Sequence, residues 1–193
     1  MKETLYILIF IIVFYVVFAM KDSTLETINL NGDKVLVRKT PNMKASAVLL
    51  NELINKMYIL RDYLVANVDT FSKEHQQYII YMENNFNKNR TKIYETSLDS
   101  NYTSYAVDKG AELAFCLRCK SSGSLHRINL LMYVAVHEMA HTACHESGHT
   151  PLFNKIFKFM LEQAINLQLY YYEDYSAHPV EYCGMKLYTN ILN

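Results

Sequence analysis

Residues 137–141 read His-Glu-Met-Ala-His, which places two imidazoles four positions apart with a carboxylate beside the first. On an α-helix, positions i and i+4 lie one turn apart on the same face. Both imidazoles can then bind one zinc ion at about 2.0–2.1 Å. Glu138 follows His137 directly, so it lies beside the ion and can take a proton from a metal-activated water as general base. The pattern predicts zinc-assisted hydrolysis.

A catalytic zinc site needs a third protein ligand and one open position. The following chain offers four candidates: His145, His149, Glu162 and Glu173. His145 would lie about 12 Å along the helix axis from His137, too far to share an ion unless the helix ends early. His149 follows Gly148, which can adopt a left-handed turn and bring the chain back. We therefore favour His149 as third ligand, and Glu162 on the next predicted helix stays an alternative.

The surrounding pattern predicts the elements that position these side chains. Residues 129–144 are apolar with helical spacing, and Pro151 fits the first turn of a further helix, 152–169. Two earlier helices are expected, one from Pro41 to about Val65 and one over 74–86. Residues 111–118 alternate like a strand after Gly110. This strand either packs as an ordinary member of the sheet or borders the cleft and pairs with an extended peptide, and both roles stay open. The tail, 170–193, is expected to be irregular.

Composition limits the class of protein. The 193 residues carry 19 basic and 19 acidic side chains, so there is no basic excess for nucleic-acid binding. Half of the residues are apolar, which indicates a folded chain. Cys116 and Cys119 have the spacing of half a zinc ribbon or of a redox pair, but the second pair that a four-cysteine zinc site needs is absent, since Cys144 and Cys183 are isolated. We expect all four thiols to be reduced, with Cys116 packed as a small apolar side chain.

The N-terminal segment is apolar and uncharged from Leu5 to Met20. Sixteen helical residues span about 24 Å, and flanking lysines can extend that reach toward the interface. We interpret 1–22 as a single membrane anchor, with a cleaved signal peptide as the alternative. Residues 23–40 are expected to be a polar spacer with a short β-like run at 35–37. Basic residues after the span slightly favour a cytosolic location for the main domain, residues 41–193.

The segment from Tyr105 to Cys183 resembles the WLM/SprT-like branch of zincin metallopeptidases, and more closely the WLM-type metallopeptidases of large DNA viruses of eukaryotes. The likeness is carried by Tyr105, Val107, Lys109-Gly110, Phe115 to Arg118, Leu131 to His141, Gly148 to Thr150, Phe153, Asp174-Tyr175 and Pro179 to Gly184. It implies zinc bound by His137, His141 and His149, with Glu138 as catalytic acid and base. Seven residues separate the second and third histidines here, where typical members of the family have five.

These observations predict an α+β, zincin-like domain, with a helical part over 41–90 and a catalytic core over 105–185, preceded by one transmembrane helix. The expected function is a membrane-anchored zinc metallopeptidase of viral origin acting on a protein or peptide. Tyr175, His178 and Tyr182 are candidates for stabilising the oxyanion of the transition state. Two alternatives stay open, namely an inactive structural or interaction protein that retains a zinc site, and a hydrolase acting on another kind of bond.

Overall fold

The computed structural model describes residues 6, 24–97, 100 and 102–192. The predicted membrane anchor, 1–22, lies outside these residues except for Tyr6. Within the described ranges, no helix combines the length and the apolar character that crossing a bilayer requires.

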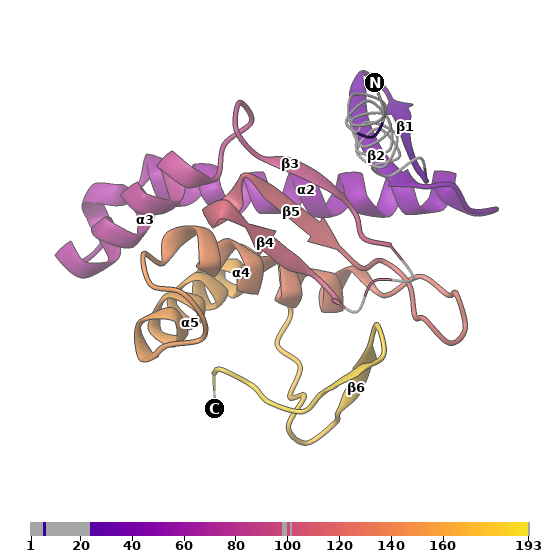
Figure 1. Ribbon diagram of the computed structural model, residues 1–193. Helices are drawn as coiled ribbons and strands as arrows, with labels where there is room; N and C mark the ends of the chain where they lie inside the picture. Colours follow the sequence, from indigo (N-terminus) through magenta and orange to yellow (C-terminus); the bar gives the residue numbers. More distant parts are fainter. Residues whose placement is uncertain (1–5, 7–23, 98–99, 101, 193) are drawn as a thin grey trace.

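Among the described residues, a mixed five-stranded sheet, a separate two-stranded sheet and four α-helices are present, which confirms the predicted α+β class (Figure 1). The sheet has the order β1-β2-β3-β5-β4, with β2, β3 and β5 parallel to one another and β1 and β4 antiparallel to their neighbours. Its strands are β1 (Leu25–Leu30), β2 (Asp33–Arg38), β3 (Lys92–Glu95), β4 (Tyr105–Val107) and β5 (Glu112–Phe115). The helices are α2 (Met43–Ala66), α3 (Lys73–Asn85), α4 (Ile128–Ala143) and α5 (Pro151–Asn166).

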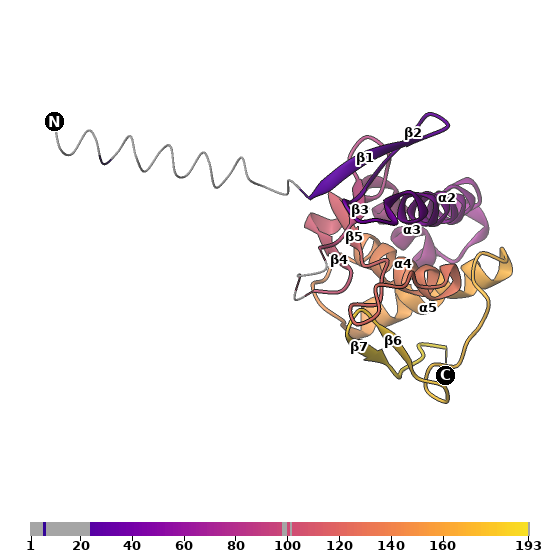
Figure 2. The same cartoon turned by 90° about the vertical axis from the view of Figure 1, so that its right-hand side faces the viewer.

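The four helices lie together on one face of the sheet (Figure 2). In α2, Leu50, Leu53, Met57, Leu60 and Leu64 recur every three or four residues and are all buried, as expected for an amphipathic helix. Helix α4 packs against α2, α3 and α5 and is buried along most of its circumference. The helix that carries the His-Glu-Met-Ala-His motif is therefore the centre of the core.

The segment predicted as a polar spacer, 23–40, differs in the structure. Its described part forms the β1–β2 hairpin, and β2 joins the main sheet through β3. Asn31 and Gly32 form the turn with φ of 54° and 105°, and Val35 and Val37 are buried. Asn-Gly is a strong signal for a two-residue hairpin turn, because both positions need positive φ. Most polar residues of this segment, such as Thr27, Asn29 and Lys34, lie on the exposed face of an edge hairpin, whereas Arg38 is buried.

Two further points about strands follow from the structure. Of the two roles left open for residues 111–118, ordinary sheet packing agrees with the position of β5 inside the sheet between β3 and β4, and the edge strand is β4. The tail was expected to be irregular, yet it contains a hairpin of β6 (Val180–Tyr182) and β7 (Met185–Leu187). This hairpin lies at the opposite end of the molecule from β1 and β2 (Figures 1 and 2).

Gly110 lies where a short 3₁₀ turn, η2 (Asp108–Gly110), touches helix α4. Its φ is +106°, and a Cβ there would come within 2.8 Å of Thr142 Cγ2 and 3.1 Å of Asn85 O. Thr142 is fully buried and its hydroxyl donates to Met139 O at 2.8 Å, so its side chain cannot simply turn away. The close approach of η2 to α4 thus depends on the absence of a side chain.

We expect Gly110→Ala to lower the free energy of unfolding by about 2–4 kcal/mol, through backbone strain together with overpacking. Gly32→Ala is the matched control, because Gly32 has nearly the same φ, +105°, but a Cβ added to it would meet no atom within 4 Å. Strain alone predicts a loss of about 1–2 kcal/mol in that variant. Urea unfolding of both proteins measures the difference, and equal losses would show that the contact with Thr142 is unimportant.

Candidate metal centre

Helix α4 brings the three functional residues of the motif, His137, Glu138 and His141, to one place. His137 and His141 lie one turn apart, with ring centroids 5.0 Å from each other, and both are partly exposed on an otherwise buried helix. Glu138, between them in sequence, is only 5% exposed. A mostly apolar helix thus turns two imidazoles toward solvent and keeps the intervening carboxyl group buried.

His149 reaches the same place from the loop between α4 and α5. Helix α4 ends at Ala143, and Gly148 takes a φ of +81°, so the chain turns back as the sequence predicted. The next helix starts directly after His149, where Thr150 Oγ1 accepts the N–H of Phe153 at 3.3 Å. His149 Nε2 lies 3.0 Å from His137 Nε2, and its ring centroid is 4.8 Å and 5.1 Å from those of His137 and His141.

The three rings therefore form a nearly equilateral triangle, and their ligand nitrogens all lie within 4.8 Å of one another. Two nitrogens bound to one tetrahedral zinc are separated by roughly 3.3 Å, given bonds of about 2.0–2.1 Å. The donor set and its spacing fit a divalent cation that binds imidazole.

Phe153 fixes the orientation of the three imidazoles. Its ring stacks on His141 at 4.3 Å and meets His137 and His149 edge-on, each at 4.9 Å. Phe157 adds an edge contact to His137 at 5.2 Å. Because both phenylalanines lie on buried positions of α5, the second helix of the pair supports the ligands of the first.

Lys109 holds the loop that carries His149. Its Nζ donates to the carbonyl oxygen of Cys144 at 2.9 Å and also to that of Glu146. These carbonyls lie just after α4, where helix ends leave acceptors without intrahelical partners. The sequence reasoning assigned Lys109 no role of its own, since the contact spans 35 residues; the only signal was the Lys109-Gly110 pair within the family resemblance.

Burial sets the protonation of the centre. Desolvation, followed by repulsion from the two neighbouring histidines, lowers the pKa of His137 to about 3. Desolvation, His149 and Lys109 lower the pKa of His141 to about 4. Desolvation alone raises the pKa of Glu138 to about 8, and within the described part of the chain this carboxyl has no ion-pair partner. Buried charges are normally paired or bind metals, so a neighbouring cation is the missing partner that would favour ionised Glu138.

The three histidines lie between two cavities. One, of about 540 Å³, is lined by Glu138 and all three histidines, and by Ser104, Tyr105 and Ala106 at the edge strand β4. The other, of about 420 Å³, borders His137 and His149 and is lined by apolar side chains such as Tyr133, Phe157 and Leu187. The larger cavity gives a ligand access to all three histidines and Glu138.

The remaining candidates lie elsewhere. His145 is exposed beyond the end of α4, and Glu162 lines a separate pocket with Glu74 and Lys155. Glu173 accepts from Arg127 at 3.0 Å. Among the residues proposed to stabilise an oxyanion, His178 is exposed and Tyr175 packs against Tyr133, whereas the hydroxyl of Tyr182 lies 2.5 Å from Ser104 Oγ on the cleft wall.

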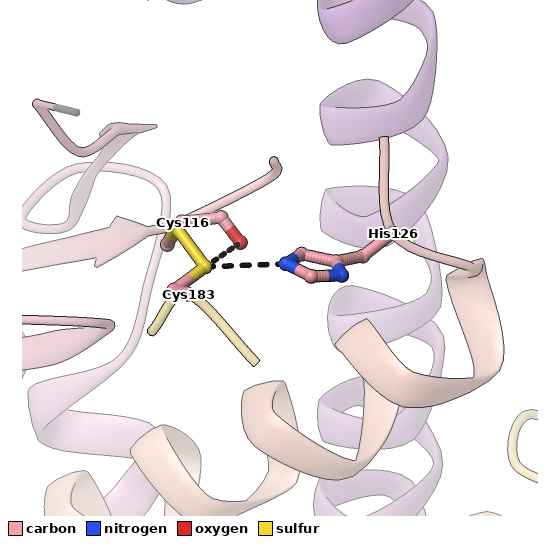
Figure 3. A group of neighbouring side chains, drawn as sticks. All are labelled: Cys116, His126 and Cys183. Carbon is pink, nitrogen blue, oxygen red and sulfur yellow. Dashed lines mark hydrogen bonds between the residues drawn. A yellow bond between two sulfur atoms is a disulfide. The ribbon is translucent and has the colours of Figure 1, made fainter. Parts of the chain in front are cut away.

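The expectation of four reduced cysteines differs from the structure, in which Cys116 and Cys183 form a disulfide (Figure 3). The two residues are 67 positions apart, with Cα atoms 6.3 Å from each other. The pairing arises because the β6–β7 turn folds back against the end of β5. Cys119 and Cys144 are free thiols, and His126 Nε2 lies 3.3 Å from Cys183 Sγ.

No family model matches the chain. Its relatives include the uncharacterized protein R325 of Acanthamoeba polyphaga mimivirus, which is 42% identical over 164 residues, or 85% of this chain and 82% of that protein. The uncharacterized protein 136R of Invertebrate iridescent virus 6 is 37% identical over 84 residues, or 42% of this chain and 47% of that protein.

Among solved structures, a Wss1 mutant from Saccharomyces cerevisiae has a similar fold, with a TM-score of 0.50 over 69% of this chain and 90% of that chain. The two sequences are 19% identical, so this likeness concerns the fold alone. The match to R325 is closer in sequence and covers most of both chains, so it shows a family relationship. This chain belongs to the family of viral proteins that includes the mimivirus protein R325.

Proposed function

We propose that the protein is a zinc-dependent metallopeptidase that hydrolyses peptide bonds in a protein or peptide substrate. One observation carries the proposal: the ligand nitrogens of His137, His141 and His149 converge within 4.8 Å beside the buried carboxyl of Glu138, at the wall of an open cleft. The resemblance of residues 105–183 to WLM/SprT-like enzymes points to the same chemistry. The domain also shares its fold with Wss1 from Saccharomyces cerevisiae.

In this proposal the three imidazoles would hold the zinc ion at the wall of the cleft. When bound, the ion would polarise the scissile carbonyl and lower the pKa of the attacking water. Glu138 accepts the proton of that water and then passes it to the leaving amine. The low pKa values of His137 and His141 keep both rings neutral near pH 7, with lone pairs ready for a cation.

Two features favour a catalytic peptidase over the alternatives. A closed structural zinc site would have a fourth protein ligand, whereas within the described residues the group contains three histidines and borders two cavities. The cleft also borders β4, an edge strand with one side free of strand partners, which suits an extended peptide better than a compact substrate. Residues 1–22 remain a proposed membrane anchor on the strength of their sequence.

Metal analysis of the purified full chain tests the proposal. We expect the wild type to contain about one zinc per chain and to cleave an unstructured protein substrate. The His149→Ala variant should lose most of the zinc and most of this cleavage. His145→Ala is the matched control, because His145 belongs to the same loop but not to the cluster. It should retain both zinc and cleavage. Equal zinc content in the two variants would contradict His149 as ligand, and a zinc-loaded wild type without hydrolysis would contradict the peptidase.

A further inference from the structure

The Cys116–Cys183 disulfide joins two segments that meet at the wall of the cleft. Cys116 directly follows β5, and Cys183 lies in the turn between β6 and β7. Both side chains are buried, and their sulfur atoms are joined beside the ring of His126 (Figure 3). Apart from this covalent bond, the short hairpin of β6 and β7 forms its own separate sheet and shares no ladder with the main one.

Each cysteine lies at, or next to, a partner of the Ser104 hydroxyl. The backbone N–H of Cys116 donates to Ser104 Oγ at 3.2 Å. On the other side, the hydroxyl of Tyr182, the residue before Cys183, lies 2.5 Å from the same oxygen. The disulfide therefore crosslinks the two chain segments between which the Ser104 hydroxyl is held.

Ser104 is part of the cleft that contains the metal centre. It lines the same cavity as Glu138, His137 and His141. Tyr182 is 3% exposed, so bulk water cannot replace Ser104 as the hydrogen-bond partner of its hydroxyl while the hairpin stays in place. Displacing the hairpin would thus release the Ser104 side chain and open a buried face of the cleft wall.

The turn itself indicates that the position of Cys183 is constrained. Cys183 and Gly184 have φ of 53° and 86°, the conformation of a tight two-residue hairpin turn. Glycine, asparagine and aspartate usually occupy such turns, and another residue in the left-handed region is disfavoured by the contact of its Cβ with the following carbonyl oxygen. A cysteine in this position directs its sulfur to Cys116, and the disulfide offsets the backbone cost.

We propose that the Cys116–Cys183 disulfide is a redox-dependent positioning element of the cleft, which holds Tyr182 and Ser104 in place beside the metal centre. The link to turnover rests on the proposed peptidase function, whereas the link to the position of the hairpin does not. Ser104 and Tyr182 are positioning residues in this scheme, because they set the shape of the cleft wall and bind no metal.

A phosphine reductant opens the bond without supplying a thiol that competes for zinc. The phosphine gives an electron pair to the two sulfurs and takes the oxygen of water, becoming a phosphine oxide. The two protons of that water complete the thiols of Cys116 and Cys183. After reduction the hairpin keeps only non-covalent contacts, so the Tyr182 hydroxyl is no longer held against Ser104 by a covalent link, while the backbone N–H of Cys116 stays within reach of Ser104.

Hydrogen exchange and kinetics on the full chain test this inference in the oxidised and reduced states. On reduction, we expect faster amide exchange at Cys116 and across 180–187, with α4 still protected. At unchanged zinc content, kcat should fall about 10- to 100-fold, with a much smaller change in KM, because misplacement of a cleft group by about 1 Å can cost that much. Cys183→Ser should behave like the reduced protein, and Cys119→Ser, which removes a free thiol, like the oxidised one.

Ser104→Ala separates positioning from general loosening. It should lower kcat while leaving the disulfide intact, and reduction should then cause little further loss. Unchanged amide exchange at 180–187 on reduction would overturn the inference. Full activity of the reduced protein would overturn it as well. That second result also counts if Cys116, His126 and Cys183 of the reduced protein bind a second zinc ion. If the oxidised, zinc-loaded protein cleaves nothing, the proposed function fails, and the exchange data alone decide the role of the disulfide.

Discussion

Replacement of Glu138 by glutamine should reduce peptide hydrolysis by at least about 10²–10⁴-fold, the usual contribution of a general acid–base group. Glutamine has nearly the same shape but cannot accept the proton of the attacking water. The zinc content should stay at the wild-type level, because the three ligand nitrogens come from His137, His141 and His149. Folding should also be preserved, since the exchange removes the cost of burying a carboxyl group that is almost wholly shielded from water.

Single-turnover cleavage and metal analysis of the same sample measure this effect. Glu162→Gln is the matched control, because Glu162 is exposed on α5 and lies away from the cluster. It should cleave at the wild-type rate. Substantial turnover by zinc-loaded Glu138→Gln would refute the proposed role of Glu138 and leave the metal centre without its general base.

The sequence predicted the part of the site that depends on local geometry. His137 and His141 share a face because four positions make one helical turn, and helix α4 follows from the apolar spacing of 129–144. The choice of His149 over His145 depended on where that helix ends. The structure ends it at Ala143, which leaves His145 outside the cluster and allows Gly148 to turn the chain back.

The rest depended on contacts between distant segments. Lys109 reaches Cys144 across 35 residues, and Cys116 reaches Cys183 across 67, and no spacing rule anticipates either contact. The expected cytosolic location of the main domain favoured reduced thiols, but whether a disulfide forms also depends on the proximity of the two side chains, which the sequence does not give. Asn31-Gly32 is different, since the hairpin signal was present in the sequence and the polar composition of 23–40 obscured it.

A buried ion pair beneath the sheet carries the largest expected effect on stability. Arg118 and Glu95 are 4% and 2% exposed, and Arg118 Nε lies 3.2 Å from Glu95 Oε1. The same guanidinium donates to Thr40 Oγ1 at 2.9 Å and to Asn42 O at 3.2 Å, so it ties β3 to the start of α2. Burial raises the pKa of Glu95 despite the opposing effects of Arg38 and Arg118.

Arg118→Met should lower the free energy of unfolding by about 3–5 kcal/mol near pH 7, because it removes the closest cation from the buried Glu95 carboxylate and leaves only Arg38 to offset that charge. Arg127→Met is the matched control, since Arg127 is 68% exposed and pairs with Glu173 at 3.0 Å. An exposed pair of this kind contributes at most about 1 kcal/mol. Urea unfolding of both variants measures the contrast, and a loss in Arg118→Met no larger than the control would contradict it.

The pH dependence of Arg118→Met identifies the cause of the loss. Without Arg118, the pKa of Glu95 in the folded protein rises further above its value in the unfolded chain. The folded state then binds more protons than the unfolded state between the two pKa values, so stability falls as the pH rises through that interval. The deficit relative to wild type should therefore be smallest at acidic pH, where Glu95 is neutral. A deficit independent of pH would assign the loss to packing around the arginine stem. The double variant Glu95→Leu/Arg118→Met separates the two causes. It should recover stability if the loss comes from the buried charge of Glu95, and recover none if the loss comes from packing.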